Sequence, residues 1–390
     1  MAEAKFERRA LLVCKKNANS ALYHRSLKSV EFEVDVTDSL ADVEALLKKN
    51  KTKILVHSLE GFERNETTKF HHNMCRSELG SQIQRFMIYR ANNMRAVAFS
   101  LDVGMQKALP QERAALTLGN AVQLVVQAMQ NRDSLQEAGL ALATSGKVVL
   151  SEDEMVQIEK VYRAFPNDMI IRSAQARVYV LRGEYPMAVE LARRILQAEP
   201  YAVRAMTILG EVEAKLGQYE LALKLIGKAN ELAGGNPDRL ATLARLCIEQ
   251  GQYPEAKKFL MEGMRLFPQL QVLRDELQKV PLNGAEVREA LSMGMPHMHG
   301  DALTQYACAL VKPLVLLRQF QFVADAINAT VEILPETNQK CGYLFKVADE
   351  LRAMGAKNEA VAQLRRCLEI DPKYPGAGDL LIKIKTNLAA

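Results

Sequence analysis

Long apolar runs and paired cysteines are both missing from this sequence. No apolar stretch approaches the roughly 20 residues that a helix needs to cross a bilayer, so we expect no membrane span. The first residues, MAEAKFERRALLVCKK, mix acids with bases around a short apolar run, so they do not predict a secretion signal. The six cysteines form no CxxC pair and are too sparse for a disulfide framework, which disfavours zinc ribbons, redox motifs and secretion. We therefore expect a cytoplasmic protein with reduced cysteines.

A strong excess of one charge is also missing. The net charge is +5, and residues 1–130 carry all of it, with 19 basic and 14 acidic side chains. Proteins that bind nucleic acid usually gather their basic residues into a stripe. The basic residues here are dispersed, so we expect no nucleic acid partner. The length of 390 residues predicts two or three domains of ordinary globular composition.

A pattern that recurs every 34 residues is the strongest feature present. The segments Gly183–Ala188, Gly217–Ala222 and Gly251–Ala256 each read Gly-x-Tyr-x-x-Ala, and Gly355–Ala360 keeps the glycine and the alanine. Glycine tolerates the positive φ that ends a helix, tyrosine packs into the corner between two helices, and alanine lets the helices approach closely. Prolines follow twelve residues after three of the alanines and mark the next connection, at Pro200, Pro268 and Pro372.

These marks strongly resemble the tetratricopeptide repeat family. Leu209-Gly210 matches the family's Leu-Gly pair in the first helix, and Tyr179 matches its later aromatic position. The resemblance implies an all-α solenoid over residues 131–390 that ends in a capping helix from Tyr374 to Leu388. Three regular repeats are implied at residues 169–202, 203–236 and 237–270. A divergent half-repeat that ends at Pro166 precedes them. A divergent repeat that contains Phe320 and a last repeat at 339–372 follow them.

Residues 271–305 break the phase of the repeats and contain a segment rich in methionine and histidine, Met293–His299. Thioethers and imidazoles suit copper. No further ligand spacing accompanies them, so we favour a loop whose methionines pack against neighbouring helices and expect no metal site.

Residues 7–130 follow a different pattern, in which short apolar or alternating runs are separated by helical stretches. The helical stretches lie at about 18–30, 39–50, 64–80 and 92–102, and a long final helix starts at about 110. Strands that alternate with helices predict a parallel sheet with helices on both faces. The first four predicted strands are Ala10–Cys14, Phe32–Val36, Lys53–His57 and Gln84–Tyr89.

Five such units resemble the receiver domain of bacterial response regulators. The resemblance implies a flavodoxin-like, doubly wound parallel sheet over residues 1–130, with Gly104–Pro110 as its fifth strand and the turn that follows. Ala91 stands where the family has an alanine after its Ser/Thr. A working receiver needs acids after the first strand to hold Mg²⁺ and an Asp at the end of the third strand to accept phosphate. It also needs a Ser/Thr after the fourth strand and a Lys after the fifth.

The residues at these positions are wrong for phosphorylation. Two lysines stand where the acids belong, and Leu109 precedes Pro110 at the lysine position. Such a site would repel a divalent cation, for which carboxylates are the usual ligands. The resemblance therefore implies a pseudo-receiver that binds no metal and accepts no phosphate. The degenerate site consists of Cys14, Lys15, Lys16, Ser58 (or His57, if the register slips by one), Arg90 and Lys107.

The same basic edge has a second interpretation. Its lysines, serine and arginine would lie at the carboxyl ends of the strands, where open α/β sheets bind ligands, so a small anion or nucleotide fits there. No Gly-rich phosphate loop is present, and no Gly-x-Ser-x-Gly elbow surrounds Ser58. His71 and His72 are adjacent in a predicted helix and point different ways, so they do not readily share a metal. We expect neither a cofactor nor an enzyme activity.

The sequence thus favours a protein-interaction adaptor or scaffold in bacterial signalling, for example within a two-component system, or in cell organisation. The repeats would hold a partner peptide or helix, and the receiver-like domain would dock a second protein. The rival hypothesis is a sensor whose first domain binds an anion or nucleotide and whose repeats transmit the change.

In tetratricopeptide repeats the first helix of each repeat lines the concave groove. Carried onto this sequence, the inward positions include Ser173, Thr207 and Asp238. The family's carboxylate clamp, which binds acidic chain ends, uses Lys and Asn at set positions. Thr207, Glu211 and Ala241 occupy several of these positions here, which disfavours acidic chain ends as the ligand. We expect reversal of three groove arginines, 177, 204 and 245, to abolish partner capture and leave the melting temperature nearly unchanged. The predicted partner-binding residues are Arg177, Arg204, Glu211, Lys215, Arg245 and Glu249.

Overall fold

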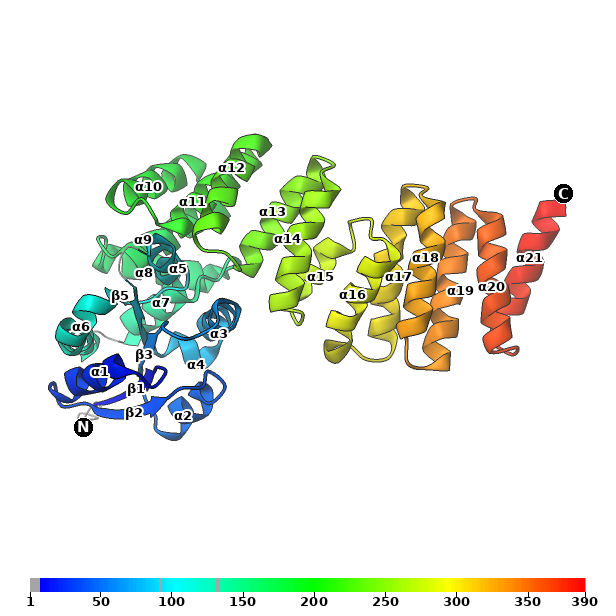
Figure 1. Cartoon of the computed structure of the whole chain (residues 1–390). Helices are drawn as coiled ribbons and strands as arrows, with labels where there is room; N and C mark the ends of the chain where they lie inside the picture. Colours follow the sequence, from blue (N-terminus) through cyan, green and yellow to red (C-terminus); the bar gives the residue numbers. More distant parts are fainter. Residues whose placement is uncertain (1–7, 91–92, 131–133, 390) are drawn as a thin grey trace. The chain divides into compact units, whose positions relative to one another are not determined.

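The computed structural model describes residues 8–90, 93–130 and 134–389 (Figure 1). The chain divides into two compact units, residues 1–239 and residues 240–390. Within the described ranges, no helix is both long enough and apolar enough to cross a bilayer. All six cysteines are buried free thiols.

Five parallel strands form a sheet in the described part of the first unit, in the order β2-β1-β3-β4-β5. The first four lie within one residue of the predicted strands, and the fifth lies inside the segment Gly104–Pro110, which was predicted to contain the strand and the turn after it. β1, β3 and β4 are buried along most of their length because helices cover both faces, whereas the edge strand β2 is not. The bounds are β1 (Arg9–Val13), β2 (Glu33–Thr37), β3 (Ile54–Ser58), β4 (Gln84–Tyr89) and β5 (Lys107–Pro110).

Helices cover both faces of this sheet. One face packs under α1 and α6, around Leu12, Val56 and Phe86. The other packs under α2 and α3, around Leu11 and Leu55. The bounds are α1 (Ala18–Lys28), α2 (Val43–Lys49), α3 (Arg64–Arg76), α4 (Glu78–Ser81), α5 (Met94–Asp102) and α6 (Gln111–Gln130).

Three pairs of helices follow in the first unit. α9 and α11 begin 34 residues apart, and so do α10 and α12, as the repeated pattern predicts. Gly183 and Gly217 end the first helices with φ of 77° and 78°, a conformation that glycine adopts without steric cost. The bounds are α7 (Ser134–Ser145), α8 (Glu152–Ala164), α9 (Met169–Leu181), α10 (Tyr185–Ala198), α11 (Val203–Lys215) and α12 (Tyr219–Leu232).

The α/β domain and these repeats share one hydrophobic core. Phe99 and Val103, from α5 and the residue after it, are buried in a single cluster with Val203 and Met206 of α11 and Ala229 of α12. The sequence places a domain boundary at residues 130 and 131. The compact units of the structure divide instead at residues 239 and 240, because α5 packs against α11 and α12.

The second unit contains further helices. Its first helix, α13, begins with residues that still belong to the first unit. α17 and α18 are joined through Arg318 at φ 54°, in the place that glycine occupies in the regular repeats. The bounds are α13 (Pro237–Glu249), α14 (Tyr253–Leu266), α15 (Gln271–Leu277), α16 (Gly284–Gly294), α17 (Asp301–Leu316), α18 (Phe320–Ile333), α19 (Thr337–Ala353), α20 (Lys357–Ile370) and α21 (Ala377–Ala389).

The segment rich in methionine and histidine spans the end of α16 and a short 3₁₀ helix, η1 (Met295–His297). The Met298 methyl group packs over Gly294, and His297 and His299 are exposed. Among the described residues, no group of three or more His, Cys, Asp or Glu side chains is placed to hold a metal ion.

Candidate functional site

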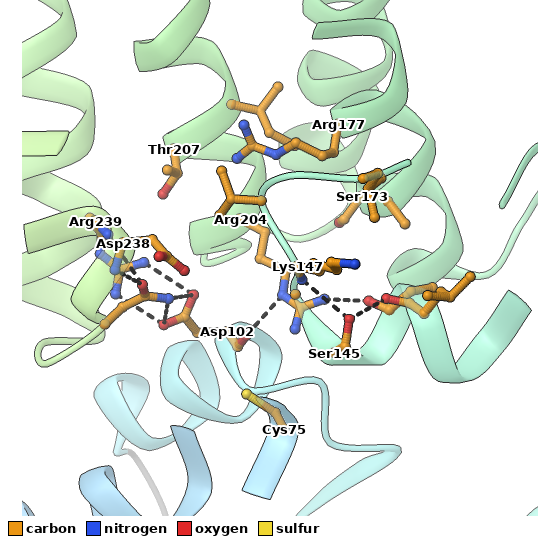
Figure 2. A pocket seen from close by; sticks show the side chains of 18 of the residues that line it. Cys75, Asp102, Ser145, Lys147, Ser173, Arg177, Arg204, Thr207, Asp238 and Arg239 are labelled. Carbon is orange, nitrogen blue, oxygen red and sulfur yellow. Dashed lines mark hydrogen bonds and ion pairs between the residues drawn. The ribbon is translucent and has the colours of Figure 1, made fainter. Parts of the chain in front are cut away.

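A pocket lies where the α/β domain meets the first helices of the repeats, within the first unit (Figure 2). On the repeat side it is lined by side chains predicted to face the groove, such as Ser173, Thr207 and Glu211. On the other side it is lined by Cys75 of α3 and Asp102 of α5, among others. We call this space the groove pocket. The groove of the first repeats is therefore partly filled by the chain's own α/β domain.

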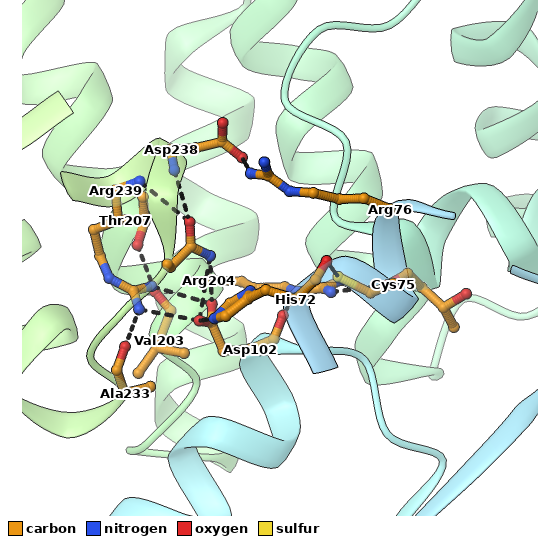
Figure 3. A network of polar contacts seen from close by, with 12 residues as sticks. His72, Cys75, Arg76, Asp102, Val203, Arg204, Thr207, Ala233, Asp238 and Arg239 are labelled. Atoms are coloured by element: carbon orange, nitrogen blue, oxygen red, sulfur yellow. Dashed lines mark hydrogen bonds and ion pairs between the residues drawn. The ribbon is translucent and has the colours of Figure 1, made fainter. Parts of the chain in front are cut away.

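Asp102, the last residue of α5, is bound by two side chains near the start of α13 (Figure 3). Arg239 donates to both Asp102 carboxylate oxygens, at 3.1 and 3.0 Å, and Asn236 Nδ2 lies 3.2 Å from Oδ2. The Asp102 and Arg239 side chains are each 2% exposed. Burial alone would raise the pKa of Asp102, but the charge and hydrogen bonds of Arg239 outweigh burial and lower the pKa. This pair ties the α/β domain to the repeats.

Arg204 makes a second connection between the two parts of this unit. Its Nε donates to the Asp102 carbonyl at 2.8 Å, and its Nη1 and Nη2 donate to the carbonyls of Ala143 and Thr144 at 2.8 and 3.0 Å. These carbonyls lie in the last turns of α5 and α7, where the partial negative charge of a helix favours a cation. Gly146 adopts φ 65°, which favours glycine, and a Cβ atom there would lie 3.0 Å from Arg204 Nη2.

Two further ion pairs line the groove pocket. Arg177 of α9 forms a two-pronged pair with Glu211 of α11, 34 residues later. Arg76 of α3 pairs with Asp238 of α13. The first pair joins equivalent positions of successive repeats, and the second joins the α/β domain to a repeat helix.

The structure changes the expectation for several predicted partner-binding residues. Arg177, Glu211 and Arg204 are engaged within the chain, so reversing Arg177 and Arg204 would break part-buried contacts. These contacts argue against the expectation of an unchanged melting temperature for the triple arginine variant, because removing one partner of an ion pair leaves the other charge unpaired. We expect this variant to melt lower than the wild type. Lys215 and Glu249 are exposed, and Arg245 pairs with Glu276 at 3.0 Å while remaining 49% exposed.

Sequence reasoning missed Asp102, Asn236 and Arg239. Asp102 ends a helix and Asn236 precedes one, which are ordinary positions for these residue types. The partners of Asp102 lie 102 and 137 residues away along the chain. No local pattern could have joined them.

The predicted pseudo-receiver residues are only partly brought together. Ser58 ends β3 and is buried, and Cys14 follows β1 and is buried, whereas Lys16 and Arg90 are exposed. Lys107 was placed at the wrong edge: it pairs with Phe86 near the amino end of β5, about 10 Å from the carboxyl edge at the strand rise. Ala91 lies outside the described residues.

Lys15 is engaged by its neighbours at this edge. Its Nζ donates to the Asp38 carbonyl at 2.8 Å and lies 4.5 Å from the centroid of the Phe62 ring. Burial and the nearby Asp38 raise the pKa of the Cys14 thiol to about 11. An acid that the sequence did not single out, Glu60, accepts hydrogen bonds from Asn17 and Gln111 at 2.8 and 3.1 Å. Lys15 and Glu60 thus hold neighbouring loops together.

Three histidines are buried where α3 packs on the sheet: His57 of β3 and His71 and His72 of α3. His57 Nδ1 lies 2.8 Å from His71 Nε2, and His72 Nε2 lies 4.0 Å from Asp102 Oδ2. Burial lowers the pKa of His57 and of His72 to about 3, with Asp102 partly opposing the effect at His72. Burial also places the pKa of His71 well below its usual value. These side chains are neutral core residues that pack beside the Asp102 network.

Three segments of the chain match the tetratricopeptide repeat family, at residues 170–194, 213–274 and 342–374. The chain contains tetratricopeptide repeats. The matched segments include helices α9, α12, α14 and α20, so the repeats continue through the second unit. No match to a receiver domain accompanies them.

One curated protein shares sequence with part of this chain. Cellulose synthase operon protein C of Pseudomonas fluorescens (strain SBW25) is 31% identical over 101 residues. The alignment covers 26% of this chain and 8% of that protein, so the chain spans less than a tenth of the relative's length.

Several solved structures have low overall similarity to this chain. The Cut9–Hcn1 hetero-tetramer of APC/C gives a TM-score of 0.40 at 15% identity, covering 94% of this chain and 64% of that chain. YrrB, a TPR protein with an unusual peptide-binding site, gives 0.32 at 14%, covering 57% and 96%. The pilF protein of Pseudomonas aeruginosa gives 0.35 at 14%, covering 66% and 99%.

Proposed function

We propose that this protein is a non-enzymatic, cytoplasmic adaptor whose tetratricopeptide repeats bind a protein segment. The observation that carries the proposal is that the repeats continue beyond the part of the chain joined to the α/β domain. Within the second unit, Arg245 and Glu249 of α13 stand at predicted inward positions and are exposed. A surface that offers both charge signs suits a partner segment with charges of its own, and arginine is enriched where binding energy concentrates.

In this proposal the α/β domain is a degenerate receiver, which docks a second protein and is not phosphorylated. The strand order 2-1-3-4-5 supports this, because it is the order of flavodoxin-like doubly wound sheets. Its α5 is already packed against the repeats. A second protein partner would use a different surface, such as α6, where Leu116 and Leu124 are 82% and 64% exposed.

The adaptor proposal is tested by capture and then by matched variants. The full chain is used as bait in a lysate of the native host, and a captured protein is purified for titration. The double variant Arg245→Glu with Glu249→Lys should weaken its binding at least tenfold. Lys258→Glu, which reverses an exposed charge on the second helix of the same repeat, is the control. Equal affinities for both variants and the wild type would remove α13 from the binding surface.

The pseudo-receiver proposal has its own test. Incubation with acetyl phosphate and Mg²⁺, followed by intact mass measurement, should leave the mass unchanged, because basic side chains replace the magnesium-binding acids. An added phosphate group on Ser58 or a nearby carboxylate would contradict it.

A further inference from the structure

The charges that line the groove pocket do not balance. Five cationic and three anionic side chains line it. Three of the arginines pair with the three carboxylates, as described above for Asp102, Glu211 and Asp238. Two cations are left over, Lys147 and Arg204. Lys147 pairs with Glu154 at 2.7 Å. Among the described residues, Arg204 hydrogen-bonds only to backbone carbonyl groups and pairs with no carboxylate of its own.

Arg204 is held in place without a full counter-charge. Three of its five N–H donors are used by carbonyls, which leaves two donors. The C-termini of α5 and α7 supply about half a negative charge each at most, which offsets part of the guanidinium charge. Burial lowers the pKa of Arg204. Asp102 and Cys75 oppose this effect on the pKa in part, whereas Arg177 and Arg239 add to it.

A second buried guanidinium lies behind the wall of the groove pocket. Arg85 of β4 is 1% exposed, and its Nε and Nη1 atoms have no hydrogen-bond partner among the described residues. Its side chain contacts the sulfur of Cys75, which lines the pocket. A buried cation without an anion is strongly destabilising. Burial lowers the pKa of Arg85, Cys75 opposes this effect in part, and the nearby Arg204 lowers the pKa further.

The size of the groove pocket limits what could supply the missing negative charge. Its volume of about 70 Å³ has room for about five water molecules. That space accommodates a tetrahedral oxyanion but neither a nucleotide nor a peptide chain. We propose that the groove pocket binds a small, doubly charged oxyanion of the size of inorganic phosphate, held by Arg204 and attracted by Arg85 behind Cys75. This site is independent of partner binding by the repeats, so either proposal can fail alone.

Inorganic phosphate is the probe for the first test. The full chain is melted in increasing phosphate at constant ionic strength, with NaCl as the balancing salt. Phosphate at ten times its Kd should raise the melting temperature of the first unit by about 3 to 6 °C, and the rise should saturate. A melting temperature that rises linearly with phosphate concentration, without saturating, would be the general effect of an excluded salt and would overturn the proposal. An unchanged melting temperature would overturn it as well.

Variants of Thr207 and Lys224 then locate the site. Replacing Arg204 would break three structural contacts, so Thr207→Asp is used to put a carboxylate into the pocket from the same helix. This variant should melt higher than Thr207→Val in phosphate-free buffer and should lose the phosphate response. Lys224→Gln, which removes an exposed charge on α12, should keep the response. A wild-type response in Thr207→Asp, or a lower melting temperature than Thr207→Val without phosphate, would overturn the site.

Discussion

Asp102 is the residue whose contacts decide how the first unit holds together. Its carboxylate neutralises Arg239, and its carbonyl binds Arg204. Both arginines come from the repeats, and Asp102 comes from the α/β domain. Because the pair is 2% exposed on each side, solvent cannot replace either partner.

Asp102→Asn should therefore be strongly destabilising. It leaves Arg239 buried without a counter-charge, and breaking a buried ion pair in this way costs about 3 kcal/mol or more. Urea unfolding of the first unit measures the effect. Glu190→Gln removes an exposed pair with Arg194 in the same unit and should cost less than about 1 kcal/mol. Equal losses for the two variants would mean that the Asp102 pair adds nothing.

The buried histidines predict a loss of stability in mild acid. The unfolded chain protonates its histidines near pH 6.5, whereas burial keeps the folded-state pKa of His57 and of His72 at about 3. The unfolded state binds more protons between these values, so stability is full above pH 6.5 and falls as the pH falls. Each such histidine contributes about 1.4 kcal/mol per pH unit in that window. Unfolding free energies measured from pH 7 to pH 4.5 should show this slope.

His72→Gln should make the same curve less steep by about the contribution of one histidine. His24→Gln, which removes a half-buried imidazole of the same unit, is the matched control. Identical slopes in His72→Gln and the wild type would show that His72 is not kept neutral by burial.

At the scale of the helix pair, the turn between two helices selects its residue by backbone geometry. Gly217 adopts φ 78° with open space around it, so a side chain there meets backbone strain alone. Arg318 stands in the equivalent turn between α17 and α18 at φ 54°. An L-residue in this left-handed region costs roughly 1 kcal/mol relative to glycine.

Opposite substitutions at these two turns should have opposite effects. Arg318→Gly should stabilise the second unit by about 1 kcal/mol, and Gly217→Ala should destabilise the first by a similar amount. Thermal unfolding of each variant against the wild type measures both. Destabilisation by Arg318→Gly would mean that the arginine side chain contributes more than its backbone strain costs.

The repeats and strands were predictable because their signals are local. The glycine, tyrosine and alanine of each repeat lie within six residues, and each strand is a short apolar run beside its own helix. The groove pocket was only half predictable. The family resemblance placed Arg177, Arg204 and Glu211 toward the groove, but the Asp102 carbonyl that Arg204 binds comes from α5 of the α/β domain. The prediction for Lys107 failed because β5 begins at this residue and runs to Pro110, so the lysine lies at the amino end of the strand.

At the scale of the molecule, buried contacts cross the predicted division at residues 130 and 131. The buried cluster around Phe99, Val203 and Met206 crosses it, and so do the bonds of Asp102. Solenoid repeats stack on their neighbours, which by itself would let residues 131–390 fold alone. The shared core predicts instead that the separated fragment exposes apolar surface and leaves Arg204 and Arg239 without the Asp102 oxygens they bind.

Fragments 1–130 and 131–390, expressed separately and mixed, should therefore recombine into one complex. The longer fragment alone should aggregate, or its first repeats should no longer melt cooperatively. Addition of the shorter fragment should restore solubility and cooperative melting, because the apolar cluster and the Asp102 bonds form again. Size-exclusion chromatography and circular dichroism measure this. Phe99→Asp in the shorter fragment should prevent recombination, whereas Leu116→Asp on the exposed face of α6 should not. If the longer fragment melts as cooperatively alone as in the intact chain and does not bind the shorter one, the two parts are independent domains and the Asp102 network contributes little to stability.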